Sequence, residues 1–144
     1  MASVTCMFNS MTHSQIFVLD QDEALDFYVG KLGFEVKADN DLGFMRWLTI
    51  NLPGQPDREI LLEKPGPPSM DEATAEQVRE LLTKGATGGW FMLTTDDCQK
   101  TYETLLARGV EFTEPPTQRP YGIDCGLRDP FGNRIRFGQL NPPA

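Results

Sequence analysis

The sequence contains the same order of structural signals twice. The segments LGFEV, with Gly33, and RGVEF, with Gly109, share a glycine followed by an apolar residue, a glutamate and a second apolar residue, about 76 residues apart. Before each glycine the sequence predicts a strand and then a helix. Glycine suits the left-handed residue that closes a helix. Because a duplicated pattern requires two similar structural units, this repeat limits the fold more than any other feature of the chain.

An aspartate precedes each predicted helix. In the first copy, Asp20 and Glu23 have the spacing of a capping box with aspartate as the cap. In the second copy, Asp96 or Asp97 takes the same place. Each copy then has room for two more strands joined by a turn, so each copy has the order β-α-β-β-β.

These signals predict an α+β fold made of two βαβββ modules. A parallel doubly wound fold would alternate strands and helices throughout, and this chain does not. The length of 144 residues suits a single domain, 1–144, with modules at 12–63 and 89–140. The predicted strands lie near 12–19, 34–39, 44–51, 59–63, 89–95, 110–114, 122–128 and 133–139. The predicted helices lie near 21–32, 70–84 and 97–108.

A linker at 64–88 separates the modules and begins with a cluster of prolines and glycines. Within it, Ser69 and Glu72 have capping-box spacing, and an apolar stripe at helical spacing follows them. This pattern predicts the extra helix near 70–84. We expect this helix to pack over a sheet edge; the alternative is a lid or a dimer contact.

The composition excludes several kinds of partner. A net charge of −8 argues against nucleic acid or an anionic membrane. No window approaches the roughly 20 apolar residues of a membrane span, and the N-terminal segment lacks the parts of a secretion signal. Cys6, Cys98 and Cys125 are far apart in the sequence and form no CxxC motif, so no disulfide framework or structural zinc site is indicated. We expect a cytoplasmic protein.

The chain contains a single histidine, His13, and this restricts its metal chemistry. Every site that needs two histidines from one chain is excluded, including the two-His-one-carboxylate iron site and the common His-rich zinc sites. A Ser-His-Asp triad would have to use His13. Its neighbour Ser14 points to the opposite face of a strand, so that pairing is poor.

The repeat and its closing turn resemble a known superfamily. The segments LDQDEALDFYVGKLGFEV, ARGVEF and DPFGNRIRF, in this order and spacing, are similar to those of the vicinal oxygen chelate superfamily, which includes glyoxalase, bleomycin-resistance and dioxygenase proteins. The resemblance covers about 12–140. It implies a cup of eight strands, four from each module, with the ligand inside. It also implies a homodimer, in some members with exchanged modules.

The resemblance further implies metal ligands on the first and last strands of each module. Catalytic members place one ligand seven residues before the capping aspartate, and His13 stands at this distance from Asp20. The other three positions correspond to Leu61, to Arg136, and to Trp90 when counted from Asp97 or Gly89 when counted from Asp96; glycine offers no side-chain ligand. Leucine and tryptophan do not ligate metals here, and an arginine repels a divalent cation and does not deprotonate to become a ligand. We therefore expect no metal at the usual place.

A displaced metal site is the alternative. Glu59, Leu61 and Glu63 share one strand face, so both glutamates face the cup if Leu61 does. His13 together with these glutamates would then hold a metal weakly.

Alternation along the strands predicts which side chains face the cup. Leu48 and Ile50 should cover the helices, which turns Trp47 towards the cup. Aromatic walls with few polar groups are typical of small-molecule sites. Core packing of the tryptophans and an Arg136 that is exposed or paired with Glu63 are the alternatives. The predicted ligand-binding residues are His13, Gln15, Trp47, Trp90, Met92, Tyr121 and Arg136.

Two classes of function agree with this pattern. In the first, the protein binds a planar small molecule between Trp47 and Trp90 without a metal or cofactor, as bleomycin-resistance proteins do, and Arg136 contacts an acidic or carbonyl-bearing edge. In the second, it is a glyoxalase- or dioxygenase-like enzyme with the displaced metal, or a metal-free catalyst that uses His13 as a base. The broken set of metal ligands favours binding.

Overall fold

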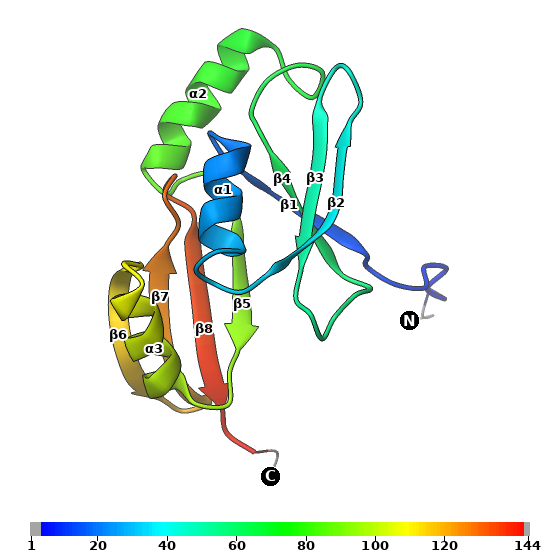
Figure 1. The fold of residues 1–144 in the computed structure, drawn as a ribbon. Coiled ribbons are helices and arrows are strands. Elements are labelled where there is room, and N and C mark those ends of the chain that lie inside the picture. Colours follow the sequence, from blue (N-terminus) through cyan, green and yellow to red (C-terminus); the bar gives the residue numbers. More distant parts are fainter. Residues whose placement is uncertain (1–3, 143–144) are drawn as a thin grey trace.

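The computed structural model describes residues 4–142 and arranges them as two four-stranded sheets with three helices (Figure 1). The first sheet has the order β1 (His13–Phe17), β4 (Glu59–Glu63), β3 (Arg46–Asn51), β2 (Glu35–Asp41). The second has the order β5 (Trp90–Thr94), β8 (Arg134–Leu140), β7 (Gly122–Arg128), β6 (Glu111–Arg119). In both sheets the first and last strands of the module pair in parallel and the other pairs are antiparallel. The predicted α+β class with eight strands is confirmed.

The helices of the two modules are capped in the same way, as the repeat predicts. The three helices are α1 (Gln21–Tyr28), α2 (Glu72–Thr83) and α3 (Cys98–Ala107). The Asp20 side chain accepts a hydrogen bond from the Glu23 backbone N–H, and Asp97 rather than Asp96 does the same for α3. Gly33 and Gly109 follow α1 and α3 with φ of 85° and 84°, a conformation that glycine adopts without steric cost.

The structure differs from the sequence prediction at the cap of α2. Asp71, and not Ser69, caps the helix by accepting from the Thr74 backbone N–H at 2.7 Å. The Ser69 hydroxyl instead contacts Glu63 and the Gly66 carbonyl. The helix therefore begins at Glu72.

The strand β6 is longer than predicted. It continues to Arg119 through Pro115 and Pro116, with two register irregularities on the way. This is possible because β6 is the edge strand of its sheet, where a proline does not interrupt pairing on both sides. The extension brings Arg119 into the second sheet.

One face of each sheet packs against the helices and builds a common core. This core contains Ile16, Leu48, Ile50 and Leu62 from the first sheet, Leu127, Ile135 and Phe137 from the second, and Phe27, Tyr28, Cys98 and Leu105 from α1 and α3.

The opposite face of each sheet is called its open face. Because side chains alternate along a strand, His13, Gln15, Trp47 and Leu61 share the open face of the first sheet. Trp90, Met92, Arg134 and Arg136 share that of the second.

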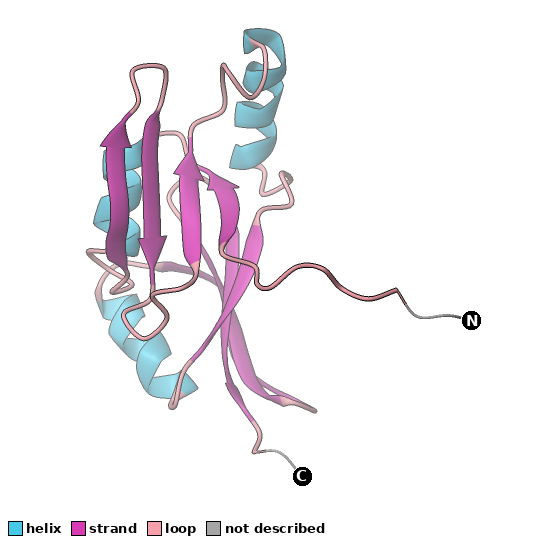
Figure 2. Ribbon diagram, turned by 90° about the vertical axis from the view of Figure 1, so that its right-hand side faces the viewer, coloured by secondary structure: helices cyan, strands magenta, loops and turns pink. Residues whose placement is uncertain are grey.

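Side chains rather than paired strands join the two modules. The Asn133 amide donates to the Phe17 carbonyl at 2.8 Å, and the Phe34 and Phe91 rings meet edge to face. Figure 2 shows the N-terminal arm, residues 4–12, projecting away from the rest of the chain. No helix among residues 4–142 is long and apolar enough to cross a bilayer.

Candidate functional site

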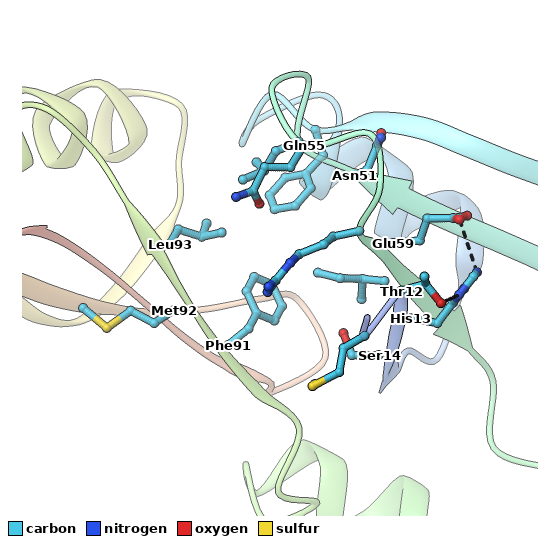
Figure 3. Close-up of a pocket in the computed structure, with 14 residues that line it drawn as sticks. Thr12, His13, Ser14, Asn51, Gln55, Glu59, Phe91, Met92 and Leu93 are labelled. Carbon is cyan, nitrogen blue, oxygen red and sulfur yellow. Dashed lines mark hydrogen bonds and ion pairs between the residues drawn. The ribbon is translucent and has the colours of Figure 1, made fainter. Parts of the chain in front are cut away.

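On the open face of the first sheet, His13 is held by polar contacts on both ring nitrogens (Figure 3). Its Nε2 lies 3.2 Å from Glu59 Oε2, and its Nδ1 lies 2.8 Å from the Thr12 hydroxyl. The Thr49 hydroxyl donates to the other oxygen of Glu59 at 2.7 Å. The Trp47 ring lies next to the imidazole, with 6.0 Å between ring centroids. The structure therefore brings His13, Glu59 and Trp47 together.

The displaced metal site predicted at His13, Glu59 and Glu63 lacks its third ligand, because Glu63 lies away from the other two. Glu63 pairs in register with Phe17 at the far end of β1, and its carboxylate accepts from the Ser69 hydroxyl. Leu61 lies between the two glutamates on the same strand and provides no ligand atom. Within residues 4–142 no group of three or more His, Cys, Asp or Glu side chains is arranged to hold a metal ion.

On the open face of the second sheet, Trp90, Met92 and Arg136 lie on one surface. Arg136 is the register partner of Met92. Figure 3 shows Met92 on the other side of β5 from Phe91 and Leu93, as alternation requires. Trp90 is 57% exposed, so its indole presents apolar surface to solvent.

Arg136 is not a free cation. Its guanidinium pairs with Asp124 at 3.0 Å and with Glu114 at 3.4 Å. Arg119 pairs with the same two carboxylates. Two cations therefore match two anions. Glu63, the partner of Arg136 that the sequence suggested, lies on β4 of the other sheet.

Asp124 is the centre of this charged cluster, which consists of Asp124, Glu114, Arg119, Arg136 and Tyr121. It is 1% exposed and accepts a 2.7 Å hydrogen bond from the Tyr121 hydroxyl. Burial acts to raise the pKa of Asp124, but hydrogen bonds from the tyrosine and the two arginines outweigh burial and hold that pKa below its ordinary value. Asp124 is therefore ionised, and the arginines of the cluster balance its negative charge.

Two different hollows contain four of the seven predicted residues: His13 and Met92 line the first, Trp90 and Arg136 line the second, and Gln15, Trp47 and Tyr121 line neither. The seam pocket, of about 170 Å³, lies between the modules, and His13, Glu59, Phe34, Phe91 and Leu93 line it. The arginine hollow, of about 440 Å³, lies on the open face of the second sheet. Its lining includes Trp90, Thr113, Gly126, Arg128, Arg134 and Arg136. Within the described residues, the Trp47 ring contacts His13 and the Trp90 ring contacts no other aromatic ring.

A glycine in the lining of the arginine hollow allows two side chains to approach the backbone closely. Gly126 lies in the same row as Arg136 across the second sheet. A Cβ at Gly126 would stand 2.9 Å from the Thr113 hydroxyl and 3.0 Å from Arg136 Nη1. The missing side chain therefore leaves room for the Thr113 hydroxyl and the Arg136 guanidinium to lie close against the backbone.

Sequence reasoning did not identify Gly126, Arg128, Glu114 or Arg119 as part of this face. Arg128 had an available signal, because a strand pair joined by the turn at 129–133 places 128 opposite 134. Glu114 ends the predicted strand 110–114, but the sequence gives no sign of the register irregularities on both sides of it, and Arg119 lies beyond a double proline that argues against a strand.

Comparisons with known proteins give a consistent result. The family model described as "Glyoxalase/Bleomycin resistance protein/Dioxygenase superfamily" matches residues 10–137. The crystal structure of UcmS2 is 41% identical and superposes with a TM-score of 0.86, covering 92% of this chain and 99% of that one. TnmS3, an antibiotic binding protein from Streptomyces sp. CB03234, is 28% identical with a TM-score of 0.75, covering 95% of this chain and 100% of that one. The uncharacterized protein YurT of Bacillus subtilis (strain 168) is 37% identical over 88% of this chain and 95% of its own length.

Proposed function

This chain belongs to the Glyoxalase/Bleomycin resistance protein/Dioxygenase superfamily, and from this membership we propose that it binds a planar small molecule on the open faces of its sheets without a metal ion. Membership and neighbours such as the antibiotic binding protein TnmS3 support small-molecule binding or resistance at the level of the family. In the proposed site, His13, Gln15 and Trp47 come from the first sheet, and Trp90, Met92, Tyr121 and Arg136 come from the second.

One observation carries the proposal: the exposed indole of Trp90 lines a hollow on the open face of the second sheet. An exposed indole beside a hollow offers a flat apolar surface for stacking and buries it only when a ligand is present. Met92, on the same face, adds a polarisable side chain that adapts to the shape of a ligand. The metal positions held by Leu61 and Arg136 support binding without a metal.

The proposal includes a homodimer in which a second copy completes the site. Trp47 and Trp90 lie on the open faces of different sheets. The N-terminal arm also presents four apolar side chains that the chain itself leaves 80–94% exposed. They are Val4, Met7, Phe8 and Met11. A second copy of the chain would cover such a surface.

The proposal also includes a cytoplasmic location and a small-molecule partner rather than nucleic acid. The buried thiols of Cys98 and Cys125 lie 3.9 Å apart without a disulfide, as expected in a reducing compartment. The net charge of −8 disfavours a polyanionic partner.

The test uses naphthalene-2-carboxamide, a neutral planar probe, and the two indole N–H signals in NMR spectra of the labelled protein. We expect the Trp90 signal to shift on titration and Trp90→Leu to weaken binding about fivefold to tenfold, as the loss of a stacked ring implies. Phe44→Leu, which alters another exposed aromatic residue, is the control and should leave the affinity unchanged. Equal affinities for the wild type and Trp90→Leu would contradict the proposal.

A further inference from the structure

We infer that Arg128 and Arg134 form an anion subsite on the open face of the second sheet, which takes a carboxylate, phosphate or sulfonate group of the ligand. For the ligand's ring this inference depends on the proposed function, because the ring is expected to stack on Trp90. For the anion it depends only on the two arginines. The acidic edge of the ligand would then contact Arg128 and Arg134, which have no carboxylate partners among the described residues. Arg136, the contact predicted from the sequence, already pairs with two carboxylates.

The two arginines are neighbours across the hairpin. Arg128 ends β7 and Arg134 begins β8, and the two residues are directly opposite each other in the register. Side chains at opposite positions of an antiparallel pair lie on the same face with Cβ atoms about 5 Å apart. Like charges at such positions repel each other and destabilise the pair. An anion between them would remove this repulsion.

No carboxylate of the described residues compensates them. Arg136 and Arg119, on the same sheet, each pair with both Asp124 and Glu114, whereas neither Arg128 nor Arg134 forms an ion pair within residues 4–142. Glu111 stands opposite Arg128 on β6, but its carboxylate does not pair with that guanidinium. Two uncompensated cations are therefore adjacent on a chain whose net charge is −8.

The surroundings match a ligand that is both flat and acidic. Trp90 is the register partner of Arg134 on β5, so the row Trp90, Arg134, Arg128 runs across three strands. The arginine hollow beside this row contains no carboxylate in its lining. Guanidinium groups bind planar oxyanions with two parallel hydrogen bonds, so a carboxylate attached to a ring on Trp90 would reach them in a favourable geometry.

The experiment compares naphthalene-2-carboxylate with naphthalene-2-carboxamide, which has the same ring without the charge. We expect Arg128→Gln and Arg134→Gln each to weaken carboxylate binding about tenfold and amide binding less than about twofold, as the loss of a charged hydrogen bond implies. Arg134→Lys keeps the charge and should recover part of the affinity. Lys37→Gln, which removes a cation from the exposed strand β2, is the matched control and should change neither affinity.

Inorganic sulfate provides a second probe that does not need a ring. In the wild type it should shift the backbone amide signals of Arg128 and Arg134, and the double Gln variant should abolish these shifts. Equal losses for the carboxylate and the amide, or an unchanged carboxylate affinity in both Gln variants, would overturn the anion subsite. If Trp90→Leu leaves both ring probes unaffected while sulfate still binds at the arginines, the proposed function fails and the subsite stands.

Discussion

The Tyr28 hydroxyl donates a 2.7 Å hydrogen bond to Asp129 Oδ2, although the two residues are 101 positions apart in the chain. Both side chains are buried. The other oxygen of Asp129 accepts the backbone N–H groups of Phe131, Gly132 and Asn133 at 2.8–3.0 Å. The Asp129 carboxylate therefore stabilises the closing turn of the second module and also binds that turn to α1 of the first module.

Tyr28→Phe should lower the free energy of unfolding by about 1–3 kcal/mol, because the buried Asp129 carboxylate loses a hydrogen-bond donor. Denaturation by urea measures the change. Tyr102→Phe is the control, since the Tyr102 hydroxyl has no hydrogen-bond partner among the described residues. A Tyr28→Phe protein as stable as the wild type would show that this bond does not couple the modules.

The same tyrosine predicts a pH dependence. Burial raises the pKa of Tyr28 well above its ordinary value of 10.0, and the charge and hydrogen bond of Asp129 act in the same direction. A pKa that is higher in the folded state contributes stability that is fully present below the unfolded value and is lost as the pH rises above it. Wild-type stability should therefore decline more steeply above about pH 10 than that of Tyr28→Phe. Parallel declines in the two proteins would contradict this assignment.

Arg136→Met should destabilise the fold, because it leaves Glu114 and the buried Asp124 with one arginine instead of two. Removing one partner of a buried pair costs about 3–5 kcal/mol, and the 26% exposure of Arg136 reduces the expected loss to about 1–3 kcal/mol. Combining Arg136→Met with Asp124→Asn should recover part of it. Thermal unfolding of the single and double variants gives the coupling between the two residues, and strictly additive losses would argue against it.

The repeat allowed most of the fold to be predicted, and the partners of Arg136 show where prediction stopped. The glycines at 33 and 109 and the caps at 20 and 97 are local signals, so they could be identified from neighbouring residues alone. Arg119 shares both carboxylate partners of Arg136, and it reaches them only because β6 continues past two prolines, which depends on the position of β6 at the sheet edge. Local sequence contains no information on that position.

The candidate site depends on how two sheet faces are assembled. The sequence predicts one cup face for all the site residues, and the structure has Trp90, Met92 and Arg136 on the open face of one sheet and His13 and Trp47 on that of the other. Whether these two faces meet depends on how the modules pack, which is decided by long-range contacts such as Asn133 with Phe17. No pattern within either module specifies such contacts.

Sedimentation equilibrium should show a species of twice the chain mass of 16.2 kDa. Replacing Met7 and Phe8 by serine should weaken this association, because both side chains are more than 80% exposed in the single chain and lie on the projecting arm. Val36→Ser, at a less exposed apolar residue of β2, is the control. A monomer at all concentrations would remove the second copy from the proposed site.

Metal should not be needed for binding, because the positions that the family resemblance implies for metal ligands are Leu61, Trp90 and Arg136 in this sequence. His13 and Glu59 are the two donor side chains that meet, and the glutamate already accepts a hydrogen bond from Thr49. A divalent ion held by two protein ligands binds weakly compared with three- or four-ligand sites. Elemental analysis of protein purified without a metal-affinity step should therefore find less than one equivalent of zinc, nickel or manganese. A chelator should leave the affinity for naphthalene-2-carboxamide unchanged. Two results together would contradict binding without a metal and support a displaced metal centre. They are stoichiometric metal that is absent from His13→Gln, and loss of probe binding when a chelator is added.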